Sequence, residues 1–146
     1  MITVSATDEK AQEVAWKAYD VMSEEQGLRS TTADIAIEAS DGALTLNGRV
    51  RTNNLFELAE RLARSAIDGW QLHNNLISDD EVALALAGKL AADHRTMDAN
   101  VRFEVYMGVA YLKGTVRDKD QHATVLELTG KVPHVVRIED QLTVAR

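Results

Sequence analysis

Four basic side chains stand in two segments that alternate apolar and polar residues. Arg49 and Arg51 lie in the first segment, and Lys113 and Arg117 lie in the second. Residues two or four apart point to the same face of a β-strand, so each pair is expected on an exposed sheet face. Guanidinium and ammonium groups there could bind phosphate or carboxylate groups of a partner. The alternative is that they are ordinary charges on a solvated face, which acidic neighbours partly neutralise.

The sequence contains no recognisable set of catalytic or metal-binding residues. Cysteine is absent, and the four histidines have no metal-ligand spacing. There is no glycine-rich phosphate loop, no Gly-x-Ser-x-Gly signature and no Gly-x-x-Gly clamp of the KH type. The acidic run Asp79-Asp80-Glu81 stands where a helix is expected to begin, and negative charge is favoured there without a metal. The sequence therefore predicts that the protein is not an enzyme and binds no cofactor and no metal.

Four glycines are expected to shape the backbone. Gly42 and Gly108 stand at expected hairpin turns, and Gly48 and Gly114 lie in the middle of expected strands. Glycine within a strand costs about 0.5–1 kcal/mol relative to alanine, so the missing side chain must serve a purpose. We expect close approach of a helix to the sheet at these two positions. A small groove that admits a ligand is the alternative.

The elements that must position these residues occur twice in the chain. Residues 35–78 align without a gap on residues 101–144, at a constant offset of 66. The aligned pairs include Gly42 with Gly108, Leu46 with Leu112, Gly48 with Gly114, and Leu76 with Leu142. Such a repeat indicates two copies of one supersecondary unit. We therefore predict two domains, residues 1–78 and 79–146, joined without a linker rich in proline or glycine.

Each copy is expected to fold as helix, strand, strand, helix, strand. In the first copy Thr7 and Asp8 can begin a helix, and Asp41-Gly42 marks a hairpin between two alternating segments. Asn54 and Glu57 form a capping box for the second helix. The predicted fold class is α+β, with two αββαβ modules that each have a three-stranded mixed sheet and two helices on one face.

The second copy repeats this plan with different capping and turn residues. Ser78 with Glu81 and Asp118 with Gln121 are the expected helix caps. Met107 precedes the hairpin glycine, where a turn of this kind prefers aspartate or asparagine. The second hairpin is therefore expected to keep the fold with an unusual residue in its turn.

Composition sets weaker limits on the partners and the compartment. The formal net charge is −7, so the chain repels nucleic acid at long range and no nucleic-acid partner is expected. No apolar stretch reaches the length of about 18 residues that a transmembrane segment needs. The first residues lack the basic start and apolar stretch of an export signal. The sequence as given predicts a cytoplasmic protein, or a periplasmic one if an upstream signal was removed.

The residues of both hairpins and closing strands resemble the BON family, named for bacterial osmotically induced and nodulation proteins. In the first copy the matching residues are Ile35-x-Ile37, Asp41-Gly42-x-Leu44-x-Leu46-x-Gly48-x-Val50 and Gly69-Trp70-x-Leu72-x-Asn74-x-Leu76. In the second copy they are Val109-Ala110-Tyr111-Leu112-x-Gly114-x-Val116 and Val132-Pro133-His134-Val135-x-x-Ile138-x-Asp140-Gln141-Leu142-Thr143-Val144. His134 departs from the family pattern, which usually has glycine there. The resemblance implies tandem αββαβ domains without catalysis that contact phospholipid surfaces or partner proteins, in an envelope-, stress- or transport-associated role.

The sequence thus predicts a non-enzymatic binding module whose partner is a phospholipid surface or a protein. Its predicted contact residues are Arg49, Arg51, Lys113 and Arg117. The alternative is a structural adaptor or oligomerisation module that acts through an unpaired strand edge or the first helix. Sheets of only three strands leave edges open for such contacts. A homo-oligomer is compatible with both interpretations.

Overall fold

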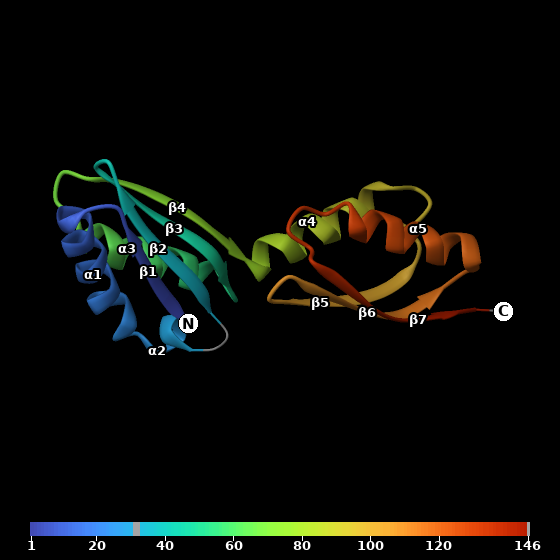
Figure 1. The fold of residues 1–146 in the computed structure, drawn as a ribbon. Coiled ribbons are helices and arrows are strands. Elements are labelled where there is room, and N and C mark those ends of the chain that lie inside the picture. Colours follow the sequence, from blue (N-terminus) through green and yellow to red (C-terminus); the bar gives the residue numbers. More distant parts are fainter. Residues whose placement is uncertain (31–32, 146) are drawn as a thin grey trace. The chain divides into compact units, whose positions relative to one another are not determined.

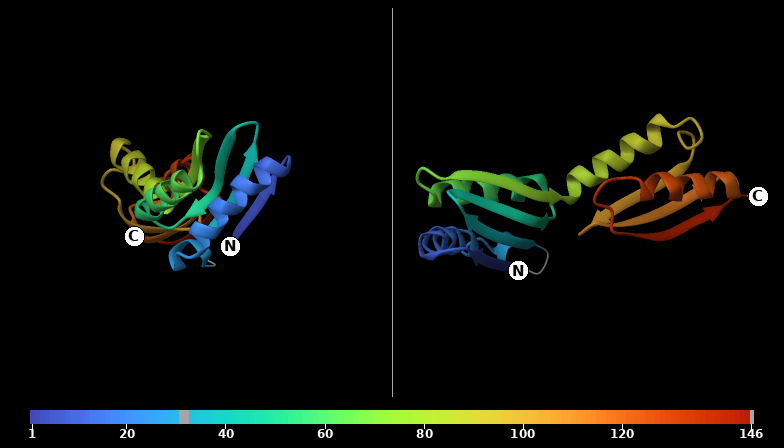
Figure 2. Two further views of the ribbon diagram at one scale, coloured as in Figure 1. Left: turned by 90° about the vertical axis from the view of Figure 1, so that its left-hand side faces the viewer. Right: turned by 45° about the horizontal axis from the view of Figure 1, so that its top comes forward.

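The chain forms two compact units in a computed structural model, which describes residues 1–30 and 33–145. The units are Met1–Ser78 and Asp79–Arg146. In Figure 1 each unit is one sheet with its helices on one face, and the two views in Figure 2 show the same layering. The predicted α+β fold with two repeated modules is confirmed. No described helix has the length and apolar composition needed to cross a membrane.

The first unit is built on a mixed sheet. Its elements are β1 (Ile2–Ala6), α1 (Glu9–Ser23), α2 (Gln26–Arg29), β2 (Asp34–Ser40), β3 (Ala43–Val50), α3 (Asn53–Ala66) and β4 (Gln71–Ser78). The strand order is β1-β2-β3-β4. β2 and β3 form an antiparallel hairpin, whereas β4 lies parallel to β3 after the α3 crossover.

The first sheet has four strands, one more than predicted. β1 pairs in parallel with β2, and Ile2 lies beside Ile35. The N–H of Ile35 donates to the carbonyl of Met1 at 2.9 Å, and the N–H of Thr7 donates to the carbonyl of Ala39 at 3.3 Å. The additional strand therefore covers the outer edge of β2, where the predicted sheet would have ended.

The second unit follows the same plan with three strands. Its elements are α4 (Asp79–Ala92), β5 (Asn100–Tyr106), β6 (Val109–Val116), α5 (Lys119–Gly130) and β7 (Arg137–Val144). The strand order is β5-β6-β7, with β5 antiparallel and β7 parallel to β6. Both β5 and β7 are edge strands among the described residues.

Alternating strand residues and one stripe of each helix form the two cores. In the first unit the buried strand residues include Ile35, Ile37, Leu44, Leu46 and Val50. They pack with small residues of α1 and α3 such as Ala11, Ala15, Ala18, Ala59 and Ala63. Each large aliphatic side chain contributes about 1.5–3 kcal/mol by this burial. Because the strand pattern has a period of two, the opposite face of each sheet remains available for contacts.

Two helix starts follow the sequence prediction. The Asp8 carboxylate accepts from the N–H of Ala11 at 2.8 Å and caps α1. The Asp118 carboxylate accepts from the N–H of Gln121 at 2.8 Å and caps α5. The hydrogen bond from this N–H of Gln121 is the largest cause that lowers the pKa of Asp118, and the adjacent Arg117 guanidinium lowers it further. Both caps thus satisfy amides that have no partner within their helix.

The predicted cap of α3 is wrong by two residues. The cap is Thr52, whose hydroxyl accepts from the N–H of Leu55 at 3.2 Å, so Asn54 already lies inside the helix. The first helical residue, Asn53, accepts a hydrogen bond from the Ser78 hydroxyl at the end of β4. This contact joins the start of α3 to the last strand of the sheet.

Candidate functional site

Gly48 and Gly114 permit a close strand contact in each hairpin. Their φ angles are 127° and 118°. A Cβ atom at Gly48 would lie 1.8 Å from the carbonyl oxygen of Asp34, and one at Gly114 would lie 2.0 Å from that of Asn100. The expected approach of a helix is therefore wrong, because the neighbouring strand makes this contact. The missing side chain of each glycine therefore allows the two strands of its hairpin to approach closely, in the same way in both repeats.

Both hairpins turn through two residues with positive φ, the pattern of a type I′ turn. The angles are 50° at Asp41 and 79° at Gly42 in the first unit, and 47° at Met107 and 85° at Gly108 in the second. Methionine rarely adopts this left-handed conformation, which is strained for residues other than glycine, asparagine and aspartate. The unusual residue thus leaves the turn type unchanged but requires support from elsewhere.

The carboxylate of Asp79 supplies support to the second turn. The N–H of Met107 donates to Oδ2 of Asp79 at 2.7 Å, and the N–H of Gly108 donates to Oδ1 at 3.1 Å. Asp79 is the first residue of α4, and its side chain is buried. One carboxylate therefore interacts favourably with both the helix N-terminus and the turn amides. Among the described residues no group of three or more possible ligands could hold a metal ion.

The four predicted contact residues belong to different units. Arg49 and Arg51 are in the first unit, and Lys113 and Arg117 are in the second. Arg49 is half-buried on β3, and its Nη1 makes no hydrogen bond within the described part of the chain. Each unit therefore carries one pair of the predicted cations. Within the second unit, the surroundings of Lys113 and Arg117 also differ.

Arg117 is engaged by neighbouring carboxylates. Its Nη1 lies 2.9 Å from Oδ2 of Asp98, and its Nε lies 3.3 Å from Oδ2 of Asp118. These pairs are exposed, so each contributes little to stability. They still reduce the positive charge that Arg117 presents to a partner. Lys113 is different, because it lies in a hollow of the second sheet.

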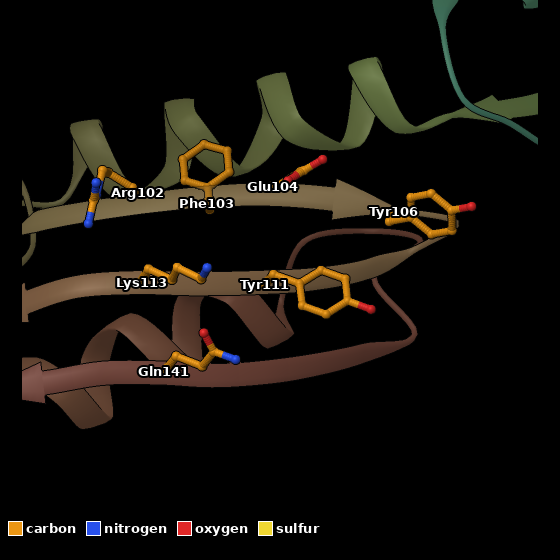
Figure 3. Close-up of a pocket in the computed structure, with 7 residues that line it drawn as sticks. All are labelled: Arg102, Phe103, Glu104, Tyr106, Tyr111, Lys113 and Gln141. Atoms are coloured by element: carbon orange, nitrogen blue, oxygen red, sulfur yellow. The ribbon is translucent and has the colours of Figure 1, made fainter.

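An open hollow of about 520 Å³ lies on the second sheet. Figure 3 shows side chains from all three strands around it, with both helices behind the sheet. We call it the tyrosine hollow, and its residues are Arg102, Phe103, Glu104, Tyr106, Tyr111, Lys113 and Gln141. Phe103 stands at the β5 rim of this hollow (Figure 3). The tyrosine hollow is therefore open to solvent rather than an enclosed chamber.

Strand register places like charges opposite each other in the tyrosine hollow. Arg102 on β5 faces Lys113 on β6, and Glu104 faces Tyr111. Two cations at directly opposed positions destabilise a sheet unless an anion lies close to both. Glu104 offsets part of this repulsion from the diagonal position. The arrangement favours a ligand that brings a further negative charge to Arg102 and Lys113.

The first repeat does not carry this chemistry at the matching positions. At the offset of 66, Arg102, Tyr106, Tyr111, Lys113 and Gln141 correspond to Ala36, Ser40, Thr45, Asn47 and Asn75. Only the glutamate is kept, and in the first unit Glu38 accepts a hydrogen bond from the Asn47 side chain. The two scaffolds agree at their glycines and buried leucines, whereas this outer face differs. The second sheet therefore carries the more specialised surface.

Sequence reasoning named Lys113 as a contact residue but missed Tyr106 and Tyr111. Tyrosine supplies a rigid apolar ring with a polar end and is enriched where proteins contact partners. Tyr106 is 40% exposed. Comparison of the two repeats, position by position along the polar face, would have identified both rings as additions to the second copy.

Comparisons with known proteins place the chain among characterised folds. A family model described as "BON domain" matches residues 12–77 and 78–146. Two solved structures of CdsD, a structural protein of the type III secretion system of Chlamydia trachomatis, are similar in fold. Each has 19% sequence identity and a TM-score of 0.71 and matches 96% of this chain, covering 68% and 66% of the respective CdsD chain. No curated protein matches the sequence.

Proposed function

The chain belongs to the BON domain family, and we propose that it is a non-enzymatic binding module whose second unit contacts an anionic surface of a protein partner. The proposal is carried by one observation: two tyrosines and two opposed cations line an open hollow in the second unit, and the matching positions of the first unit are small and neutral. Tyrosine and arginine are enriched in the energetically important centres of protein interfaces.

The open form of the tyrosine hollow supports binding rather than turnover. A catalytic site holds reacting groups in a water-excluding cavity, whereas these side chains stand on an exposed sheet face. The resemblance to CdsD supports an assembly role in the envelope or in secretion, since CdsD is a structural protein of the type III secretion system. We place this chain in the same broad class of non-catalytic assembly proteins.

A phospholipid surface is the second candidate partner. Arg102 and Lys113 could meet phosphate headgroups while Tyr106 and Tyr111 lie at the depth of the interface, where aromatic rings are favoured. The net charge of −7 weighs against long-range attraction to an anionic membrane. The protein partner therefore stands first.

Replacement of Tyr111 by threonine, its counterpart in the first repeat, is expected to weaken partner binding by about tenfold or more. The ring provides contact area at the centre of the tyrosine hollow, and threonine removes it while keeping good strand propensity. The measurement is the apparent dissociation constant for proteins captured from a native lysate on the immobilised full-length chain. Thr45→Ala, at the matching position of the first unit, is the control and should bind as the native chain does.

Vesicle co-sedimentation distinguishes the second candidate. Vesicles of phosphatidylcholine alone and of phosphatidylcholine with phosphatidylglycerol are compared for the native chain and for Tyr111→Thr. Loss of sedimentation with anionic vesicles in the variant alone would favour a lipid partner. If protein capture and vesicle binding are both unaffected by Tyr111→Thr, the tyrosine hollow is not the binding surface.

A further inference from the structure

Two rows of side chains cross the outer face of the second sheet within the tyrosine hollow. Strand register places Arg102 beside Lys113 and Lys113 beside Gln141, so these three form one row across β5, β6 and β7. The next row has Tyr111 at its centre, on the same strand as Lys113 (Figure 3). Residues two apart on a strand lie about 6.6–6.8 Å apart. The first row therefore presents hydrogen-bond donors, and the second presents an aromatic ring at about that distance from them.

The donors of the first row are not used inside the protein. Among the described residues, the side chains of Arg102, Lys113 and Gln141 take part in no hydrogen bond and no ion pair. The two carboxylates of the second row, in contrast, are engaged. Glu139 forms an ion pair at 3.2 Å with the arginine two residues before it, and Glu104 also has an interaction within the protein. In the described part of the tyrosine hollow, the unengaged charge is therefore positive.

We propose that the tyrosine hollow recognises an extended acidic segment of a protein partner, in which an aspartate or glutamate stands two residues from an aromatic residue. This inference rests on the proposed function and specifies the chemistry of the partner. The carboxylate of the segment accepts hydrogen bonds from the Arg102 guanidinium, the Lys113 ammonium and the Gln141 amide. Its two oxygens offer about four acceptor positions, so one carboxylate can use all three donors. Charge-assisted bonds of this kind are the stronger ones in proteins.

The aromatic residue of the segment packs against Tyr111. The Tyr111 side chain is half-buried, and neither Tyr111 nor Phe103 contacts another ring in the part of the chain that the structure describes. Aromatic rings pair favourably in offset or edge-to-face arrangements, and Phe103 at the β5 rim supplies a second apolar wall (Figure 3). Their counterparts in the first repeat are Thr45 and the fully buried Ile37. The ring contact is therefore specific to the second repeat.

The spacing of the two rows matches an extended chain. In an extended segment, residues two apart point to the same side and lie about 6.6–6.8 Å apart, which is the separation of Lys113 and Tyr111 along β6. In an α-helix, residues two apart do not share a face, and residues four apart have Cβ atoms about 5–6 Å apart. The segment therefore runs along β6 on the outer face of the sheet and pairs with no strand edge.

Titration of the full-length chain with short blocked peptides, followed by nuclear magnetic resonance, tests this chemistry. The probes are acetyl-Gly-Glu-Ser-Phe-Gly-amide and its reverse order, acetyl-Gly-Phe-Ser-Glu-Gly-amide, because the two rows are compatible with either direction of the segment. At least one of them should shift the amide signals of β5, β6 and β7. Replacing its glutamate by glutamine should weaken binding by about tenfold or more, because the neutral amide loses the charge-assisted bonds.

A change of spacing tests the extended conformation. In acetyl-Gly-Ser-Glu-Phe-Gly-amide the same residues are adjacent, and successive side chains of an extended segment point to opposite sides. This peptide should bind as weakly as the glutamine peptide. Binding equal to that of the better probe would contradict an extended segment with both side chains on the sheet.

Matched variants of the protein locate the carboxylate. Lys113→Asn, which introduces the residue of the first repeat, should weaken binding of the glutamate peptide by about fivefold or more and leave the glutamine peptide nearly unchanged. Lys119→Asn removes the same charge at the start of α5 and should bind the glutamate peptide as the native chain does. Both lysines are exposed, so the melting temperatures of the variants should match that of the native chain.

Equal affinity of the glutamate and glutamine peptides would overturn the proposal, as would amide shifts confined to residues outside β5, β6 and β7. The absence of binding at millimolar peptide would do the same. If lysate capture depends on Tyr111 while both peptides bind alike, only the acidic motif is wrong. If the glutamate peptide binds as expected while capture is unaffected by Tyr111→Thr, the proposed function fails and the carboxylate chemistry of the tyrosine hollow stands.

Discussion

Replacement of Gly48 by alanine is expected to destabilise the first unit by roughly 3 kcal/mol or more. The new Cβ would lie 1.8 Å from the Asp34 carbonyl oxygen, and a φ of 127° is unfavourable for any side chain. A unit of this size has about 4–12 kcal/mol of stability in total. The melting temperature of its transition should fall by roughly 12–24 °C, as measured by calorimetry.

Hydrogen exchange assigns this loss to the correct hairpin. Gly48→Ala should increase amide exchange in β2 and β3, and Gly114→Ala should do so in β5 and β6, where the clash is with the Asn100 carbonyl. Gly130→Ala is the control, because a Cβ atom there meets nothing within 4 Å and the residue ends α5. Its effect should stay within about 0.5 kcal/mol. Equal stability of Gly48→Ala and Gly130→Ala would refute the steric explanation.

Replacement of Asp79 by alanine is expected to cost the second unit about 2–4 kcal/mol. The change removes the acceptor for the N–H groups of Met107 and Gly108, of which the latter is buried. It also removes a negative charge from the first turn of α4. The loss should be measured by urea unfolding, and faster exchange should concentrate at the β5–β6 turn.

A matched variant separates the turn contact from the helix charge. Asp80→Ala removes a charge from the same helical turn without removing the bonds to Met107 and Gly108, so it should cost about 1 kcal/mol or less. Met107→Asn in the Asp79→Ala background should recover part of the loss, because asparagine tolerates the left-handed conformation. If Asp79→Ala and Asp80→Ala cost the same, Asp79 does not support the turn.

Local patterns predicted most of the repeated fold but not the strand β1. The Asp41-Gly42 hairpin, the Asp8 and Asp118 caps and the parallel closing strands follow from residue type and spacing. β1 has only five residues, and the helices α1 and α2 separate it from its partner β2. The alternation of Ile2 and Val4 was visible in the sequence, yet no turn signal joined it to a neighbouring strand.

The candidate site depended on information that only the strand register supplies. The mid-strand glycines could be recognised because glycine is unfavourable within a strand. The reason why glycine is needed there required the φ angle of Gly48 and the position of the Asp34 carbonyl. Likewise, the opposition of Arg102 and Lys113 follows from the number of residues in the turn. Sequence reasoning placed cations on each sheet face but could not say which of them would share a hollow with tyrosines.

The most direct test exchanges the tyrosine hollow for the surface of the first repeat. Tyr106→Ser, Tyr111→Thr and Lys113→Asn are combined in one full-length chain, whose folding is checked by its unchanged melting temperature. Partner capture from a native lysate is then compared quantitatively with capture by the native chain. We predict that capture by the exchanged chain falls to background. Capture equal to that of the native chain would contradict the claim that the second repeat carries the binding surface.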